Sequence, residues 1–380
     1  MDQAMRRQRP ARIPVMCQMA NGHNVINTGV HPIDYFVDSK LWGDCLMKMR
    51  ALYDFDGILC HKPSRTPNLM KLVTDINRDL EVPTMYLNDG SRIECTRDDD
   101  AYYKKPPGFR YPTLDEIDYE HPMSWAPESY HAFQWSKGTF DFKTAEEIPV
   151  EAYAMIDHVI AKCGEEFSVH GEVRAPMDHF LSLLGMEDGL VALLTEPENT
   201  ERLLETCTKW SVALAVGQMR RGAHAIKISS PFAGAGFLPP EMYERYIVPC
   251  EGRIAAAVAK EGGFTYTHTC GSIGDRLELI MQCGVSGVEC LDPPPLGNVD
   301  LAEAVRILGG GGLFIKGNID PVNTLLRGDA AKVDRDITEI LETAGHTMDG
   351  FILSSACSVA PPTPPANIKR AVELARNFKP

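Results

Sequence analysis

The sequence lacks the features that mark several common protein classes. No apolar run approaches the roughly 20 residues of a membrane-spanning helix, so we expect no membrane span. Basic residues are too few for a nucleic-acid surface, because 38 Lys and Arg stand against 52 Asp and Glu, for a formal net charge of −14. The basic residues 1–12 are followed by no apolar segment of signal-peptide length. We therefore expect a cytoplasmic protein.

A framework of disulfide bonds is also not expected. The 11 cysteines are an odd number in a chain of 380 residues without a recognisable secretory signal. Most are expected to be small buried apolar side chains, and this interpretation covers Cys45, Cys60, Cys163, Cys207, Cys250 and Cys283. Cys270 and Cys357 each follow an apolar strand, and they call for a different explanation.

Short apolar or β-branched runs alternate with helical patterns through most of the chain. Eight candidate strands lie near residues 13, 57, 167, 225, 264, 287, 313 and 351. Such alternation predicts βα units around a parallel sheet, and eight units predict a (β/α)8 TIM barrel. A doubly wound sheet is the alternative, but it would bring far fewer polar strand ends around one cavity. We therefore predict a single TIM-barrel domain over residues 1–380.

Residues 62–149 interrupt this alternation. Prolines, tyrosines and charges crowd together there, as in Tyr102-Tyr103-Lys104-Lys105-Pro106-Pro107. The segment is too long for a plain loop. We interpret it as an insertion after the second strand, with a small β-hairpin around residues 84–96, that covers one end of the main fold.

The strongest chemical signal lies at residues 264–271. His268 and Cys270 are two positions apart in a predicted strand, so both side chains point to the same side. Cys357 ends a later apolar strand, and in a barrel both strand ends open on the same face. His, Cys and Cys with one open position form a ligand set that catalytic zinc uses. The alternatives are inert burial of His268 and Cys270, or a closed structural site with Asp, Glu or Cys17 as fourth ligand.

The composition of this ligand set indicates a type of chemistry. Two thiolates make a bound zinc electron-rich, so it activates water poorly but holds an anionic sulfur or oxygen nucleophile well. We therefore favour group transfer over hydrolysis.

Other strand ends carry polar side chains that could serve the same cavity. We predict Glu172, Asp292 and Asn318 as catalytic residues and Gln18, His23, His61 and Ser229 as substrate-binding residues. Carboxylates at strand ends often cap the next helix instead, and histidines there are often structural. Asp320-Pro321 has the form of a helix start, so we rank Asn318 above Asp320.

Three motifs in this order resemble the uroporphyrinogen decarboxylase superfamily. They are His268-Thr269-Cys270-Gly271 after a strand, Lys316-Gly317-Asn318-Ile319-Asp320-Pro321, and Cys357 followed by a proline-rich turn and Asn367-Ile368. Within the superfamily the chain looks like the cobalamin-dependent methyltransferases, with good coverage over 150–380, weak coverage over the first sixty residues and hardly any over 62–149. The resemblance implies a (β/α)8 barrel in which His268, Cys270 and Cys357 bind zinc and the metal activates a thiol such as coenzyme M.

The decarboxylases of this superfamily are less similar at the substrate-binding positions. Their first strand runs into an arginine-bearing motif that grips porphyrin carboxylates, whereas Gln18-Met19-Ala20-Asn21-Gly22-His23 contains no arginine. Their catalytic aspartate after the second strand is replaced near His61-Lys62. Decarboxylation of uroporphyrinogen is therefore disfavoured.

Together these features predict a zinc-dependent methyltransferase. It would move a methyl group between a small methyl ether or thiol and the cobalt of a corrinoid, carried on a partner corrinoid protein. One alternative is a decarboxylase for another carboxylated substrate that uses Asp292 or Glu172. A non-catalytic binding protein with closed structural zinc is the other. The direction of transfer and the oligomeric state stay open at this point.

Overall fold

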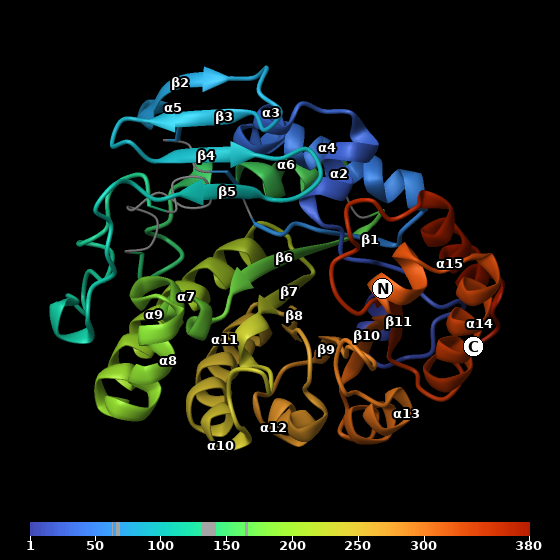
Figure 1. Cartoon of the computed structure of the whole chain (residues 1–380). Helices are drawn as coiled ribbons and strands as arrows, with labels where there is room; N and C mark the ends of the chain where they lie inside the picture. Colours follow the sequence, from blue (N-terminus) through green and yellow to red (C-terminus); the bar gives the residue numbers. More distant parts are fainter. Residues whose placement is uncertain (63, 66–68, 131–141, 164–165) are drawn as a thin grey trace.

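The computed structural model describes residues 1–62, 64–65, 69–130, 142–163 and 166–380. Its main feature is a parallel sheet of seven strands in the order β1-β6-β7-β8-β9-β10-β11 (Figure 1). The strands are β1 Gly57–Leu59, β6 Ser168–Arg174, β7 Ala225–Ser229, β8 Phe264–Thr269, β9 Gly287–Cys290, β10 Phe314–Ile319 and β11 Phe351–Ser355. Spatial order follows chain order, so the twisted sheet curls steadily in one direction. These strands match seven of the eight predicted ones.

The first predicted strand, near residue 13, is not a regular strand. Residues 13–19 make only two isolated bridges, Val15 with Leu353 and Met19 with Val359. Val15 N–H donates to the Asp56 carboxylate at 2.8 Å instead of to a neighbouring strand. Pro14 has no N–H to donate. The described strands thus form a curled half-barrel, and the complete eight-stranded barrel stays a prediction.

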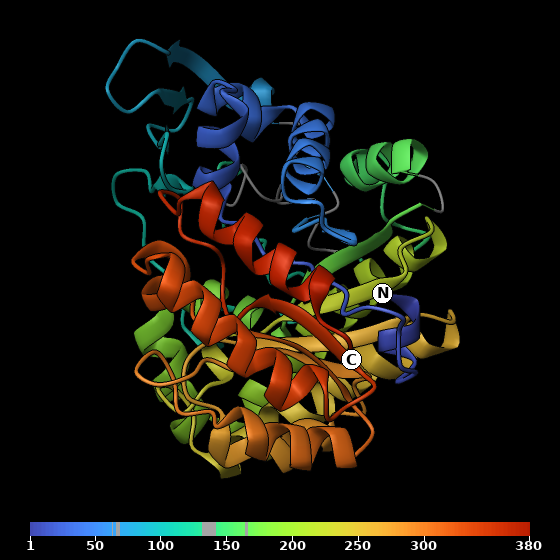
Figure 2. The same ribbon diagram turned by 90° about the vertical axis from the view of Figure 1, so that its right-hand side faces the viewer.

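Helices surround the curled sheet (Figure 2). The helices of four or more residues outside the insertion are α1 Asp2–Met5, α2 Asn21–Thr28, α3 Pro32–Val37, α4 Ser39–Tyr53, α6 Ala154–Cys163, α7 Pro176–Leu184, α8 Met186–Thr195, α9 Pro197–Arg220, α11 Val248–Lys260, α12 Leu277–Gln282, α13 Leu301–Ala304, α14 Ala330–Ile340 and α15 Pro365–Asn377. The apolar stripe expected on α9 is buried, with Leu203, Cys207, Trp210 and Leu214 facing the core. None of the helices in the described ranges combines the length and apolarity that a membrane crossing requires.

The segment between β1 and β6 contains a second, antiparallel sheet. Its strands are β2 Val73–Asn77, β3 Thr84–Leu87, β4 Arg92–Cys95 and β5 Ala101–Lys104, paired in that order. The pair β3 and β4 is the hairpin predicted around residues 84–96. Met85, Ile93 and Cys95 are buried and join the main core, and the sheet lies beside α3 (Figure 1). The short helix α5 Leu69–Leu72 precedes β2.

Five of the six cysteines expected to be buried are buried. Cys45, Cys60, Cys163, Cys207 and Cys283 are buried, Cys250 is half-buried, and all six are free thiols. The cysteines at the strand ends form a separate group.

Candidate metal centre

His268, Cys270 and Cys357, predicted to meet, lie together at the carboxyl ends of β8 and β11. Cys270 Sγ is 3.4 Å from His268 Nε2 and 3.5 Å from Cys357 Sγ. Cys357 Sγ is 3.9 Å from His268 Nε2. The two strands end on the same side because every pairing in the sheet is parallel.

These distances fit a tetrahedral zinc ion. Zn–S bonds of about 2.3 Å and Zn–N bonds of about 2.0–2.1 Å imply separations of about 3.8 Å between two sulfurs and about 3.6 Å between nitrogen and sulfur. The observed separations of 3.5 Å for the sulfurs and 3.4 and 3.9 Å for nitrogen to sulfur lie close to both values. The three side chains could therefore hold zinc with little movement.

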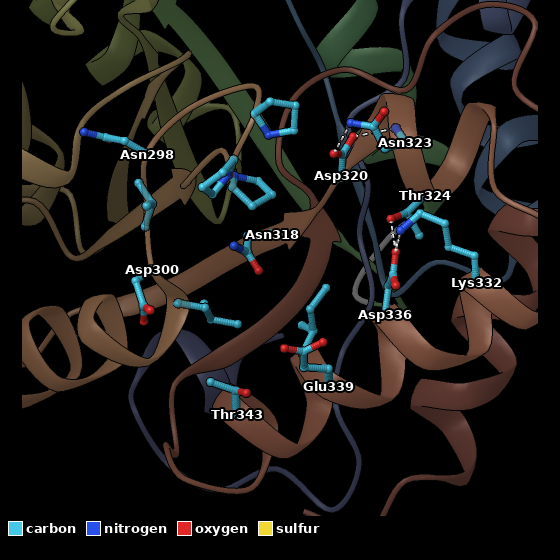
Figure 3. Close-up of a pocket in the computed structure, with 16 residues that line it drawn as sticks. Asn298, Asp300, Asn318, Asp320, Asn323, Thr324, Lys332, Asp336, Glu339 and Thr343 are labelled. Atoms are coloured by element: carbon cyan, nitrogen blue, oxygen red, sulfur yellow. Dashed lines mark hydrogen bonds and ion pairs between the residues drawn. The ribbon is translucent and has the colours of Figure 1, made fainter.

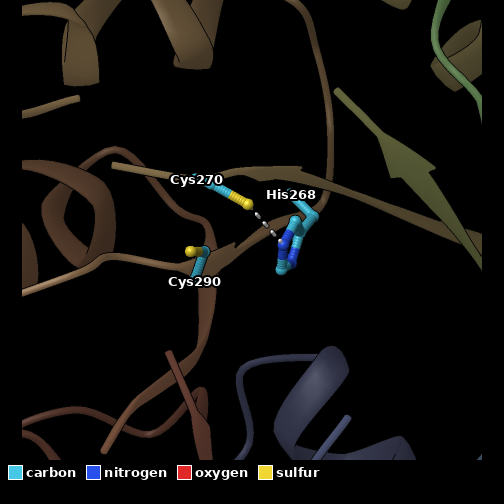
Figure 4. A group of neighbouring side chains, drawn as sticks. All are labelled: His268, Cys270 and Cys290. Carbon is cyan, nitrogen blue, oxygen red and sulfur yellow. Dashed lines mark hydrogen bonds between the residues drawn. The ribbon is translucent and has the colours of Figure 1, made fainter. Parts of the chain in front are cut away.

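A third cysteine, which the sequence did not point to, lies beside this group. The ligand atoms of His268, Cys270 and Cys290 all lie within 4.8 Å of one another (Figure 4). Cys290 follows Glu289 directly, and Glu289 points at His268, so a regular strand would turn the thiol of Cys290 to the opposite face. Positive φ angles of 87° at Cys290 and 59° at Leu291 bend the chain there. This left-handed backbone brings the thiol to the metal site.

Glu289 fixes the orientation of the His268 ring. His268 Nδ1 lies 2.9 Å from Glu289 Oε2, and both side chains are buried. A carboxylate that accepts from Nδ1 leaves Nε2 free for a metal and strengthens the imidazole as a ligand. Burial and the Lys227 charge lower the pKa of His268, but contacts with Cys270, Cys357 and Glu289 outweigh them and raise it well above its usual value. The site thus favours a positive charge at His268 Nε2, which is the position a metal would take.

Glu289 belongs to a buried row of charges inside the curled sheet. Lys316 Nζ donates to Glu289, and Lys227 Nζ lies 3.7 Å from Glu289 and 3.3 Å from Glu172. Lys227 also donates to Gln18. Two lysines and two glutamates balance, as buried charges must. Sequence reasoning missed both lysines and Glu289, because a strand pattern does not show which polar side chains share the interior.

Glu172 is held as a carboxylate in this row. Burial raises its pKa, but the Lys227 charge and the contact with His61 outweigh burial and lower the pKa to about 2. His61 Nδ1 lies 3.4 Å from Glu172, and His61 Nε2 is 3.0 Å from the Met19 carbonyl. Of the predicted site residues, Gln18, His61 and Glu172 are therefore joined to the metal site through Lys227.

Asp292 lies next to the cysteines. Its Oδ2 accepts from Gly271 N–H at 2.7 Å and from the Cys290 thiol at 3.3 Å. Its Oδ1 is buried without a partner among the described residues. Burial raises the pKa of Asp292 above its usual range. Ser229 is the register neighbour of His268 on β7. The structure thus brings both residues to the metal site.

His23 and Asn318 make their hydrogen bonds to groups other than the three ligands. The His23 ring is fully buried, with Nδ1 2.9 Å from the Pro361 carbonyl and Nε2 2.7 Å from the Tyr53 hydroxyl. Both nitrogens are occupied, which disfavours its predicted role in substrate binding. Asn318 Nδ2 donates to the Leu291 carbonyl at 3.1 Å, so its amide is anchored to the segment beyond the cysteines.

Asn318 also lines a cavity of about 560 Å³ between the loop after β9 and α14 (Figure 3). Acidic side chains gather around this cavity, namely Asp300, Asp320, Asp336 and Glu339. Asp320 accepts from the backbone N–H groups of Val322 and Asn323, so the predicted helix start at Asp320-Pro321 is confirmed.

Comparison with known proteins identifies the family. A family model described as uroporphyrinogen decarboxylase (URO-D) matches residues 141–378. The chain belongs to this family. The match covers nearly the same stretch as the resemblance drawn from the sequence motifs, and it confirms that resemblance.

Methyltransferases and decarboxylases are both among the similar proteins. The methylcobamide:CoM methyltransferase MtbA of Methanosarcina acetivorans is 28% identical over 218 residues, which is 57% of this chain and 60% of the relative. MtaA of Methanosarcina barkeri, a protein of the same description, is 25% identical over 211 residues. A uroporphyrinogen decarboxylase of Syntrophotalea carbinolica is 29% identical over 192 residues, half of each chain. The similar proteins therefore include methylcobamide:CoM methyltransferases as well as decarboxylases.

A solved structure supports the fold over nearly the whole chain. A methyltransferase from Methanosarcina mazei superposes with a TM-score of 0.71 over 98% of this chain and 96% of its own, at 18% identity. The curled parallel sheet is therefore shared with that protein. By contrast, the chain spans only about 60% of the length of MtbA in the sequence match.

Proposed function

We propose that this protein is a zinc-dependent methyltransferase that exchanges a methyl group between a small substrate and the cobalt of a corrinoid. The corrinoid would be carried by a partner protein, and the small substrate would be a thiol or a methyl ether. The proposed location is the cytoplasm. The names of the relatives, which couple methylcobamide with CoM, support the proposal.

The donor geometry at the strand ends carries this proposal. His268, Cys270 and Cys357 lie at separations that match the edges of a zinc tetrahedron, and they supply three ligands. With these three protein ligands alone, the fourth coordination position of a tetrahedral zinc stays open for a heteroatom of the substrate. Zinc, when bound, would keep a substrate thiol deprotonated near neutral pH while leaving the sulfur reactive. A methyl group on cobalt, held in line with that sulfur, would need mainly positioning to transfer.

The surrounding residues take supporting roles in this proposal. Glu289 holds the tautomer of His268, and Asp292 lies close enough to the cysteines to accept a proton from an incoming thiol. Glu172 and His61 would shape the polar wall of the substrate site together with Gln18 and Ser229. Asn318 would fix the 290–292 segment through the Leu291 carbonyl rather than touch substrate.

The outer parts of the chain would complete the enzyme. We propose that residues 13–19, which bridge to β11, close the half-barrel as an irregular eighth strand. Residues 62–149, with the antiparallel sheet β2 to β5, would shape the entrance for the large corrinoid or bind its carrier protein.

A decarboxylase is the second candidate, because a uroporphyrinogen decarboxylase matches half of the chain at 29% identity. It would use Glu172 or Asp292 on a carboxylated substrate and treat His268 as structural. The two lysines of the buried row, Lys227 and Lys316, are already paired with glutamates. A substrate carboxylate would therefore find no uncompensated charge on these two lysines.

Metal content and methyl transfer test the proposal. We expect about one zinc per chain in the purified protein, and demethylation of methylcobalamin in the presence of 2-mercaptoethanesulfonate, followed by the change in corrinoid absorbance. His268→Ala should abolish both. Cys283→Ala, at a buried cysteine outside the site, is the matched control and should keep both. A wild-type protein that binds no zinc and is indifferent to added zinc would contradict the proposal.

A further inference from the structure

The cavity beside Asn318 is not part of the metal centre. Its volume of about 560 Å³ falls in the range of about 300–1,000 Å³ that small-molecule sites occupy. It lies between the loop after β9, the end of β10 and α14 (Figure 3). His268, Cys270 and Cys357 are not among the residues that line it. The cavity therefore needs an explanation of its own.

The charged side chains that line the cavity are mostly acidic. Asp300, Asp320, Asp336 and Glu339 stand against a single cation, Lys332. Lys332 Nζ already pairs with Asp336 at 2.6 Å. The other three carboxylates form no ion pair within the part of the chain that the structure describes. The cavity thus carries negative charge that the protein itself does not balance.

Two of these three carboxylates keep an oxygen free for a ligand. Asp320 is not one of them, because both its oxygens accept hydrogen bonds in the helix start that follows it. Asp300 Oδ1 accepts from Glu303 N–H at 2.9 Å, and its Oδ2 has no hydrogen bond to a described residue. The Glu339 carboxylate has no partner among the described residues. Asp300 and Glu339 lie on different walls of the cavity (Figure 3).

Asn318 adds a buried acceptor that faces the same space. The residue is 3% exposed, and its Oδ1 has no hydrogen-bond partner among the described residues. The Leu291 carbonyl can only accept, so the Asn318 amide turns Nδ2 towards it and Oδ1 away. Figure 3 shows this oxygen directed into the cavity. Because buried acceptors are normally paired with a donor, this position calls for a donor from a ligand.

These features select an organic cation over a metal ion. Within the described ranges, the acidic side chains of the cavity are not among the groups whose ligand atoms come close enough to share one ion. The cavity also has apolar walls, which suit methylene groups better than a hydrated ion. The apolar residues that line it are Pro293, Pro294, Pro295, Val299, Leu301 and Ile340.

We propose that this cavity binds a small aliphatic diamine. One ammonium group pairs with Glu339 and the other with Asp300, and Asn318 Oδ1 accepts a hydrogen bond from one of them. The methylene chain lies on the apolar walls. Since Asn318 Nδ2 also holds the Leu291 carbonyl, the bound diamine would contact the segment that leads to the metal centre. The inference does not depend on the proposed methyl transfer.

Calorimetric titration of the full chain with 1,4-diaminobutane and 1,6-diaminohexane tests this proposal. We expect saturable binding of at least one diamine, and no measurable binding of 1,4-butanediol or 1,6-hexanediol, which lack the charges. Glu339→Gln and Asp300→Asn should each weaken diamine binding about tenfold, because each removes a hydrogen bond to a charged group. Asparagine caps a helix as well as aspartate does, so Asp300→Asn keeps the start of α13.

Two control variants separate the cavity from the rest of the molecule. Glu342 is exposed, lies three residues beyond Glu339 and does not line the cavity. Glu342→Gln loses the same charge as Glu339→Gln and should bind the diamine as wild type does. His268→Ala should also bind it as wild type does. An equal loss in Glu342→Gln and Glu339→Gln, or a loss in His268→Ala, would overturn the proposal.

Diffraction from wild-type crystals soaked with the diamine gives a result that does not depend on any variant. We expect density for an ammonium group within hydrogen-bond distance of Glu339 and of Asn318 Oδ1. Absence of binding by both diamines, or diamine density elsewhere with this cavity empty, would overturn the proposal. Either result would leave the proposed zinc methyltransferase intact, because zinc content and methyl transfer are measured separately.

Discussion

Replacing Glu289 by glutamine should weaken zinc binding, although Glu289 is not one of the proposed zinc ligands. Glu289 accepts from His268 Nδ1 at 2.9 Å and from Lys316, and it is fully buried. Glutamine keeps an acceptor oxygen but loses the charge that strengthens the imidazole as a ligand. Loss of such an outer carboxylate costs 10–100-fold in metal affinity, or about 1.4–2.7 kcal/mol.

The same substitution should also destabilise the protein without metal. Glu172 and Glu289 balance Lys227 and Lys316 in the buried row. Glu289→Gln leaves one positive charge there without compensation, and breaking a buried pair in this way costs about 3–5 kcal/mol. The double variant Glu289→Gln/Lys316→Met restores neutrality. It should recover most of the stability while zinc affinity stays low.

Both effects can be measured separately. Competition with a chromophoric chelator gives the zinc affinity, and urea unfolding of chelator-treated protein gives the free energy of unfolding. Glu303→Gln is the matched control, because its 3.6 Å pair with Arg306 is exposed and such pairs contribute about 0–1 kcal/mol. A folded Glu289→Gln protein with the zinc affinity of wild type would refute the argument that Glu289 prepares His268 for the metal.

Three further substitutions test single features of the site. Cys357→Ala should lose its zinc on dialysis but stay folded, as followed by metal analysis and circular dichroism; retained zinc would mean that Cys290 replaces it. His23→Ala should cost about 2–3 kcal/mol of stability by urea unfolding, because two buried hydrogen bonds are lost, with zinc content unchanged; loss of zinc instead would restore His23 to the site. Glu172→Gln should lower stability near pH 7 by about 3 kcal/mol, because Lys227 and His61 hold the pKa of Glu172 at about 2, below its ordinary 4.5.

The pH dependence of that last effect has a definite sign. The folded carboxyl group binds its proton less readily than the unfolded one, so its stabilisation is fully present above pH 4.5 and disappears as the pH falls towards about 2. Chelator-treated wild type and Glu172→Gln should therefore converge in stability across that window. A difference that is constant with pH would mean that packing, and not charge, is responsible.

The three main ligands could be found from the sequence because their convergence follows from local rules. Spacing by two in a strand puts His268 and Cys270 on one side, and parallel strands put the end of β11 beside the end of β8. The hairpin at β3 and β4 and the apolar stripe of α9 are local in the same sense. The irregular backbone at Val15 could not be predicted, because the Val15 N–H donates to the carboxylate of Asp56, which is 41 residues away in the chain.

By itself, the sequence determined the parallel βα order, the family, and a His, Cys and Cys set at one rim. Tertiary structure alone decided which further groups face those ligands. Cys290 reaches the metal site because positive φ angles turn a strand end that should point away. Glu289 gains its function because Lys227 of β7 and Lys316 of β10 reach it across the sheet. The alternation of residues in a strand predicts which face of the sheet a side chain points to. Its neighbours on other strands depend on the register and twist of the curled sheet, which involve the whole chain.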